Sequence, residues 1–208
     1  MTEQASSARQ LSLAAREREA LADTFLRVGP DAPTLCEGWQ TRDLVAHLVV
    51  REYRPDAAAG MAIPLLGGYL RSTMDSVLSE GYERAVQSFR AGPPSYSPFA
   101  IPGMDERANT VENFVHHEDV LRAQEGWQPR ELSDTDIDTL WKAIRQMGWV
   151  SSRRHDGGLI LVAGHGPRTK IKGGEPTTIV RGPVPELLMW LLGRTDHARV
   201  EVEVREAP

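Results

Sequence analysis

Apolar residues recur at helical spacing through the first half of the chain, and they predict four helices. Examples are Leu21 and Phe25 in the first helix and Leu44 and Leu48 in the second. Glycine and proline end these patterns, because neither residue favours the interior of a helix. The predicted helices cover residues 6–28, 41–53, 64–90 and 104–124, and the third is broken near Gly67-Gly68.

Local signals refine two of these segments. Thr41 is the predicted N-cap of the second helix, and Asp43 lies in the first turn, where the helix dipole favours a carboxylate. Residues 91–103 contain four prolines and predict a long irregular connection, which is either a crossover or a lid over a site.

The pattern changes after residue 129. A helix over residues 133–150 is followed by glycines, β-branched residues and short apolar runs. These runs predict strands over residues 159–162, 177–180 and 200–204, with an amphipathic helix over residues 185–192. The predicted fold class is therefore α+β: a four-helix bundle over residues 1–128, followed by a small mixed α/β domain over residues 129–208.

Composition and charge narrow the possible functions. The 208 residues are 40% hydrophobic and 25% charged, which fits one or two globular domains with real cores. The net charge of -5 argues against nucleic acid as a partner, because proteins that hold phosphate backbones carry clustered Lys and Arg. We expect no membrane partner and a cytoplasmic location, since the chain has neither a signal-peptide core nor an apolar run of about 20 residues. A single cysteine, Cys36, agrees with a reducing compartment.

A polar face on the fourth predicted helix is the best candidate for chemistry. Glu112, His116 and Asp119 lie at positions i, i+4 and i+7, so they share one side of a helix. His47 lies in an otherwise apolar stretch of the second predicted helix, where a buried imidazole needs a partner. Two imidazoles and a carboxylate leave positions on a divalent ion open, as catalytic sites require. The sequence therefore predicts a metal site at His47, Glu112 and His116.

The neighbouring candidates have simpler interpretations. Asp119 is either a fourth ligand or the partner that orients a histidine ring. His117 points about 100° away from His116 on the helix, which favours a surface or pocket residue over a ligand. Cys36 could be a thiolate ligand or nucleophile, but no histidine is close in sequence and a small buried hydrophobic role is favoured. Three further histidines are expected at the surface: His155, His165 and His197.

These motifs also carry a family resemblance. The segments PTLCEGWQTRDLVAHL (residues 33–48) and ENFVHHED (112–119) resemble the DinB-like family of metal-binding bundles. Within it they resemble the actinobacterial branch related to mycothiol-dependent maleylpyruvate isomerase. The segments TIVRGP (178–183) and ELLMWLLGR (186–194) are similar to the C-terminal domain of that group, so the resemblance covers most of the chain. The chain resembles still more closely a subgroup of that family, which consists of metal-binding proteins of unknown activity.

The resemblance implies a ligand set and a chemistry. The zinc ligands of the isomerase fall on His47, Glu112 and His116, and Ni²⁺ or Fe²⁺ would also suit such a site. A catalytic arginine of its C-terminal domain corresponds to Arg194, which could equally be an arginine that the dipole favours at a helix end. The expected function is a metal-dependent isomerase or S-transferase that uses a small thiol, mycothiol above all, on an electrophilic small molecule. The alternative is a non-catalytic metal-binding protein for stress response or metal handling.

Overall fold

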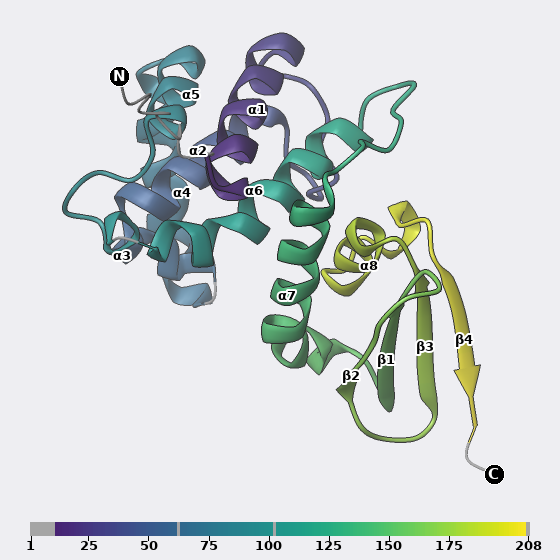
Figure 1. The fold of residues 1–208 in the computed structure, drawn as a ribbon. Helices are drawn as coiled ribbons and strands as arrows, with labels where there is room; N and C mark the ends of the chain where they lie inside the picture. The colour runs from purple at the N-terminus through teal and green to yellow at the C-terminus, as the bar shows by residue number, and fades with distance from the viewer. Residues whose placement is uncertain (1–10, 62, 102, 207–208) are drawn as a thin grey trace, which may run out of the picture. The chain divides into compact units, whose positions relative to one another are not determined.

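The chain forms an α+β fold in which the first part is helical and all the strands of the described residues lie in the last part, together with further helices (Figure 1). The structure is a computed structural model that describes residues 11–61, 63–101 and 103–206. It divides into two compact units, Met1–Val120 and Leu121–Pro208. The predicted α+β class is confirmed. No helix in the described ranges is both long and apolar enough to cross a membrane.

The first unit is helical. Its α-helices are α1 (Leu13–Val28), α2 (Thr41–Tyr53), α3 (Pro55–Ala58), α4 (Gly67–Ser79), α5 (Tyr82–Ala91) and α6 (Met104–Arg122), whose last two residues lie in the second unit. Short 3-10 helices cover Ala59–Met61, Pro64–Leu66 and Pro98–Ala100. The start predicted for the first helix, at residue 6, lies outside the described residues.

One apolar core holds four of these helices together. Phe25 of α1 and Phe89 of α5 meet edge to face in it, with ring centroids 6.2 Å apart. Burying each such side chain stabilises the fold by about 1.5–3 kcal/mol. The core is built from α1, α2, α5 and the end of α6: Leu21, Ala22, Phe25, Leu44, Val45, Leu48, Val49, Ala85, Val86, Phe89 and Val120.

A buried ion pair links the same helices. Both terminal nitrogens of Arg18 donate to the carboxylate of Glu52, at 2.8 and 2.7 Å, and one of them also donates to the carbonyl of Phe89 at 3.0 Å. Asn109 of α6 donates to the same carboxylate at 2.8 Å. Arg18 and Glu52 are both buried, so each depends on the other for compensation of its charge.

Two sequence predictions in this unit need correction. The segment 64–90 is not one helix, because the chain breaks at Gly81, whose φ of +106° lies in a region that suits glycine. The pair Gly67-Gly68 begins α4 instead of interrupting a helix. The N-cap of α2 is Gln40, not Thr41, and the carboxylate of Asp43 accepts the N–H of Gln40 at 2.9 Å.

The second unit combines two helices with a four-stranded sheet. Its elements are α7 (Asp134–Ser151), β1 (Gly158–Ala163), β2 (Arg168–Lys172), β3 (Thr177–Gly182), α8 (Val184–Leu191) and β4 (Glu201–Arg205), with 3-10 helices over Ser152–Arg154 and Thr195–His197. The strand order is β2-β1-β3-β4, with β1 and β3 parallel and both outer pairs antiparallel.

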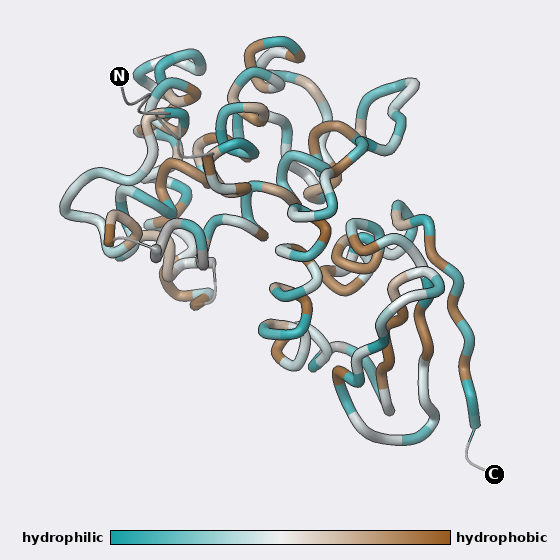
Figure 2. The backbone as a smooth tube through the Cα atoms, in the orientation of Figure 1, coloured by the Kyte–Doolittle hydropathy of each residue, from teal (hydrophilic) through white to brown (hydrophobic). Residues whose placement is uncertain are grey.

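Residue composition explains why one of these four strands was not predicted from the sequence. The central strands β1 and β3 contain runs of apolar residues, whereas β2 is an edge strand made largely of charged residues (Figure 2). For this reason β2 was not predicted. Helix α8 is almost entirely apolar and contacts β1, β3 and α7. The second unit therefore has its own core.

Candidate metal centre

His47 projects from α2 toward two residues of α6. Its side chain is 6% exposed, and its Nε2 lies 3.4 Å from Oε1 of Glu112. The ring of Trp39 lies against it, with centroids 5.1 Å apart. The other ring nitrogen, Nδ1, is buried and makes no hydrogen bond within the described part of the chain. The apolar surroundings therefore leave Nε2 as the nitrogen that faces polar groups.

Glu112 and His116 complete the cluster from one face of α6. His116 Nε2 lies 3.4 Å from the same Oε1 of Glu112, as their i, i+4 spacing predicts. One ligand atom from each of His47, Glu112 and His116 lies within 4.8 Å of the others. Ligand atoms about 2.1 Å from a tetrahedral zinc ion would be about 3.4 Å apart, so the two distances from Glu112 to the histidines fit such an ion. The structure thus brings the three predicted ligands together.

The two histidines of the cluster have pKa values that are shifted in opposite directions. Burial lowers the pKa of His47, and the nearby His116 and Arg51 lower it further, so this ring is a neutral potential ligand. Burial would also lower the pKa of His116, but hydrogen bonds with Asp119, Cys36 and Glu112 outweigh it and raise that pKa well above the ordinary value. Burial favours protonation of Glu112, yet the two histidines and Arg51 hold the pKa of its carboxyl well below the usual range.

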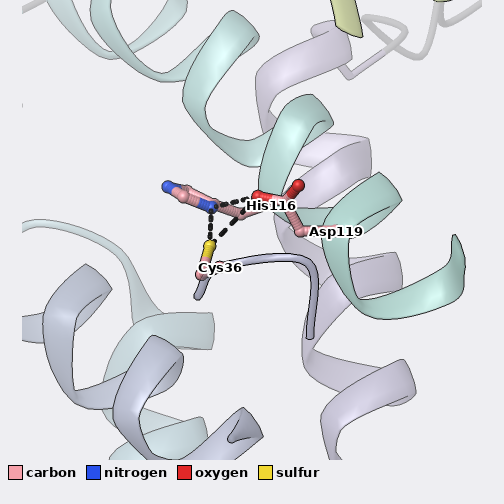
Figure 3. Close-up of side chains that lie close together, drawn as sticks. All are labelled: Cys36, His116 and Asp119. Atoms are coloured by element: carbon pink, nitrogen blue, oxygen red, sulfur yellow. Dashed lines mark hydrogen bonds and ion pairs between the residues drawn. The ribbon is translucent and has the colours of Figure 1, made fainter. Parts of the chain in front are cut away.

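Asp119 lies behind His116. Its Oδ2 is 2.9 Å from Nδ1 of His116 (Figure 3), whereas Glu112 lies near the other ring nitrogen, Nε2. The carboxylate of Asp119 is fully buried. Of the two roles predicted for Asp119, the geometry matches that of a partner that orients the ring, since an N–H at Nδ1 leaves Nε2 free to bind an ion.

Cys36 corrects the sequence interpretation. It is half-buried in the loop before α2, and its Sγ lies 3.8 Å from Nδ1 of His116 and 3.3 Å from Oδ2 of Asp119 (Figure 3). The histidine that it contacts is 80 positions away in the sequence but close in space. The thiol therefore has polar partners and does not act only as a small hydrophobic residue.

Arg51 is the residue that the sequence interpretation missed. It lies one turn after His47 on α2, and its Nε is 3.4 Å from Oε1 of Glu112. Its guanidinium contacts Asn109, donates to the carbonyl of Ala108 at 3.2 Å, and lies 4.7 Å from the ring centre of Phe99. The i, i+4 spacing from His47 could have identified it. Phe99 belongs to the proline-rich segment that was predicted as a crossover or lid.

The remaining histidines fall elsewhere. His117 is buried, not at the surface, and bonds with Glu17 at 2.8 Å and Thr24 at 3.1 Å, because it lies on the α1 side of α6. His155 is half-buried and stacks on Trp190, with ring centroids 4.7 Å apart, which corrects its predicted surface position. His165 and His197 are exposed, as predicted.

Arg194 belongs to the second unit, directly after α8. Its side chain is half-buried, and its Nη1 donates to the carbonyl of Leu192 at 2.8 Å. The role assigned to Arg194 from the resemblance stays a prediction.

Comparison with known proteins agrees with the motifs at the level of the fold. No family model matches the chain, and neither does any curated protein sequence. A crystal structure of the mycothiol-dependent maleylpyruvate isomerase superposes with a TM-score of 0.60 and 17% identity, over 94% of this chain and 93% of that one. A histidine-to-alanine mutant of the isomerase gives 0.56 and 18% over the same shares. The chain therefore has the fold of the mycothiol-dependent maleylpyruvate isomerase, and the resemblance seen in the sequence is confirmed to that extent.

Proposed function

We propose that this protein is a metal-dependent enzyme that uses a small thiol, mycothiol above all, to isomerise or thiolate an electrophilic small molecule. One observation carries the proposal: Oε1 of Glu112 lies 3.4 Å from Nε2 of both His47 and His116, and one ligand atom of each residue lies within 4.8 Å of the others. Three protein ligands leave a coordination position for a reactant, whereas structural sites fill all four. The fold shared with a thiol-dependent isomerase supports the choice of reaction.

In this proposal His47, Glu112 and His116 hold a divalent metal, with Zn²⁺ as the first choice and Ni²⁺ or Fe²⁺ as alternatives. The bound metal would supply Lewis acidity, which lowers the pKa of an incoming thiol and favours the thiolate nucleophile. His47 is already neutral, and Asp119 orients His116 through Nδ1. In this proposal α1, α2, α5 and α6 are the four helices of a DinB-like bundle, and the apolar core that they share supports that assignment.

Two arginines are candidates for binding an anionic group of the substrate. Arg51 lies beside Glu112, where its planar guanidinium can pair with a carboxylate or a developing oxyanion. Arg194 is the candidate from the second unit. A cytoplasmic location suits the proposal, because small thiols are kept reduced there.

The test combines metal analysis with an activity assay. The purified protein should contain about one equivalent of divalent metal and should turn over maleylpyruvate, or a related unsaturated acid, only when mycothiol and metal are both present. Removal of the metal with a chelator should abolish turnover, and Zn²⁺ should restore it. Stoichiometric metal without turnover across a panel of thiols and electrophiles would refute the enzyme proposal and favour the non-catalytic metal-binding alternative.

A further inference from the structure

A second set of metal-ligand atoms lies on the far side of the His116 ring. Sγ of Cys36, Nδ1 of His116 and Oδ2 of Asp119 lie 2.9 to 3.8 Å from one another (Figure 3). Ligand atoms of a tetrahedral zinc ion with one sulfur would lie about 3.4 to 3.6 Å apart. Shifts of a few tenths of an ångström would therefore bring these three atoms to coordination distances.

The fold holds these groups in place. The N–H of Leu35 donates to the carbonyl of Asp119 at 3.0 Å, which ties the cysteine loop to α6. The N–H of Cys36 donates to the hydroxyl of Thr34 at 3.1 Å, and that hydroxyl donates to the carbonyl of Trp39 at 2.9 Å. Hydrogen bonds on both sides of Cys36 thus set the position of the thiol. The entropy of ordering the loop is lost on folding and does not oppose metal binding.

The geometry does not match a cysteine nucleophile activated by a histidine and an acid. In such a triad the acid binds one ring nitrogen and the thiol binds the other. Here Cys36 and Asp119 both face Nδ1, while Nε2 faces Glu112. Three donor atoms converging on one point are the arrangement of a ligand set.

We propose that Cys36, His116 and Asp119 form a second metal site, for a thiophilic divalent cation, that shares the ring of His116 with the first site. A thiolate and a carboxylate together neutralise the charge of a divalent ion. This neutralisation is needed because Asp119 is fully buried and His116 is 13% exposed, and an uncompensated charge is costly in such a place. The first site offers only one carboxylate. Binding at the second site releases the thiol proton, and thiolate ligands select soft cations.

The shared ring makes the two sites alternatives. Metal at Nε2 leaves a proton on Nδ1, which Asp119 accepts, whereas metal at Nδ1 leaves a proton on Nε2, which Glu112 can accept at 3.4 Å. A neutral imidazole carries one proton and therefore serves one site at a time. A thiophilic cation would occupy the cysteine side and displace Asp119 from its role of orienting the ring.

Cobalt titration tests the second site separately from the first. The variant His47→Ala removes a ligand of the first site and leaves Cys36, His116 and Asp119 unchanged. With Co²⁺ alone, this variant should bind about one ion per chain and show the near-ultraviolet charge-transfer band of a cobalt-thiolate bond. Adding Cys36→Ser to it should abolish the band, and adding Asp119→Asn should weaken cobalt binding roughly tenfold.

The outcomes are distinct. Glu112→Gln serves as a second background in case His47→Ala does not fold, because it removes the carboxylate charge of the first site but keeps an acceptor for Nε2. Absence of the thiolate band at saturating Co²⁺ in both folded, reduced variants would overturn the proposal. The proposed enzyme function is tested by a different measurement, the turnover of the metal-loaded wild type. Absence of turnover would refute that function and would leave the result for the cobalt-thiolate band unaffected.

Discussion

Glu112 is the residue on which the candidate centre depends most directly, because one carboxylate oxygen faces both imidazoles at 3.4 Å. We predict that His47→Ala, Glu112→Ala and His116→Ala, each made in a Cys36→Ser background that removes the second proposed site, abolish stoichiometric binding of Zn²⁺, since two remaining protein ligands hold the ion too weakly. Elemental analysis after dialysis measures this. The exposed His165 provides the control, and His165→Ala should retain full metal. Full occupancy in the double variant His47→Ala, Cys36→Ser would show that the ion binds at neither proposed site.

Arg51 is predicted to bind substrate and not metal. Arg51→Met should leave the metal content unchanged and raise KM for an anionic substrate by about 10- to 100-fold, because a charge-assisted hydrogen bond contributes about 1.5–3 kcal/mol. Arg51→Lys should recover part of the loss, since lysine keeps the charge but lacks the planar fork. Steady-state kinetics of the three proteins tests this, and loss of metal in Arg51→Met would assign Arg51 to the ligand sphere instead.

At the scale of elements, the break between α4 and α5 depends on backbone conformation. We predict that Gly81→Ala lowers the free energy of unfolding by about 1–2 kcal/mol, because alanine is strained at a φ of +106° although nothing lies within 4 Å of its added carbon. Gly68→Ala, in the first turn of α4 with equal space, should instead stabilise the protein by up to about 1 kcal/mol. Denaturant unfolding measures both. Equal effects of the two substitutions would contradict the conformational explanation.

An ion pair within the second unit gives an expected pH dependence. Arg122 donates to both oxygens of Glu186 at 2.8 Å, and the N–H of Arg199 donates to one of them at 2.8 Å. Burial would raise the pKa of Glu186, but these donors outweigh it and lower the pKa below its ordinary value. A lowered pKa in the folded state means that the pair stabilises the unit above the unfolded pKa, about 4.3, and that this stability is lost as the pH falls further.

Glu186→Gln tests this dependence. The variant should be less stable than the wild type by roughly 1–3 kcal/mol near neutral pH, because Gln cannot satisfy the same charged donors. The difference should shrink as the pH falls below about 4.3, since both proteins then carry an uncharged side chain at this position. Unfolding curves from pH 7 to pH 3 measure it, and a difference that stays constant would exclude the ion pair as its cause.

At the scale of the whole molecule, Arg194 is the residue that would connect the second unit to the proposed reaction. Arg194→Ala is predicted to keep its metal and its fold but to lose thiol-dependent turnover, and Arg194→Lys should recover only part of the activity. The matched control is Arg145→Ala on the exposed side of α7, which should change turnover little. Unchanged kcat and KM in Arg194→Ala would leave Arg194 as a structural residue at the end of α8.

Much of the fold was determined by local sequence signals. The helix over residues 41–53 was predicted with the bounds that the structure shows, and the three predicted strands begin within one residue of the starts of β1, β3 and β4. Hydrophobic periodicity suffices for such segments, because α2, β1 and β3 bury apolar faces or runs and β4, although exposed, alternates valine with charged residues. It did not suffice for β2, whose Arg and Lys residues lie at a sheet edge, or for Gly81, where one dihedral angle ends a helix.

Some residues of the candidate site were likewise evident from the local sequence, and others were not. Glu112 and His116 could be assigned to one face from their spacing alone, because helix geometry relates residues four positions apart. His47 was paired with them because it is an isolated imidazole in an apolar helix, and the family resemblance implied the same three ligands. The positions of Cys36, 80 residues from His116, and of Arg51, 61 residues from Glu112, were decided only when the chain brought α2 and its preceding loop against α6. Contacts between remote segments depend on how whole helices pack, and a local pattern of residues does not contain that information.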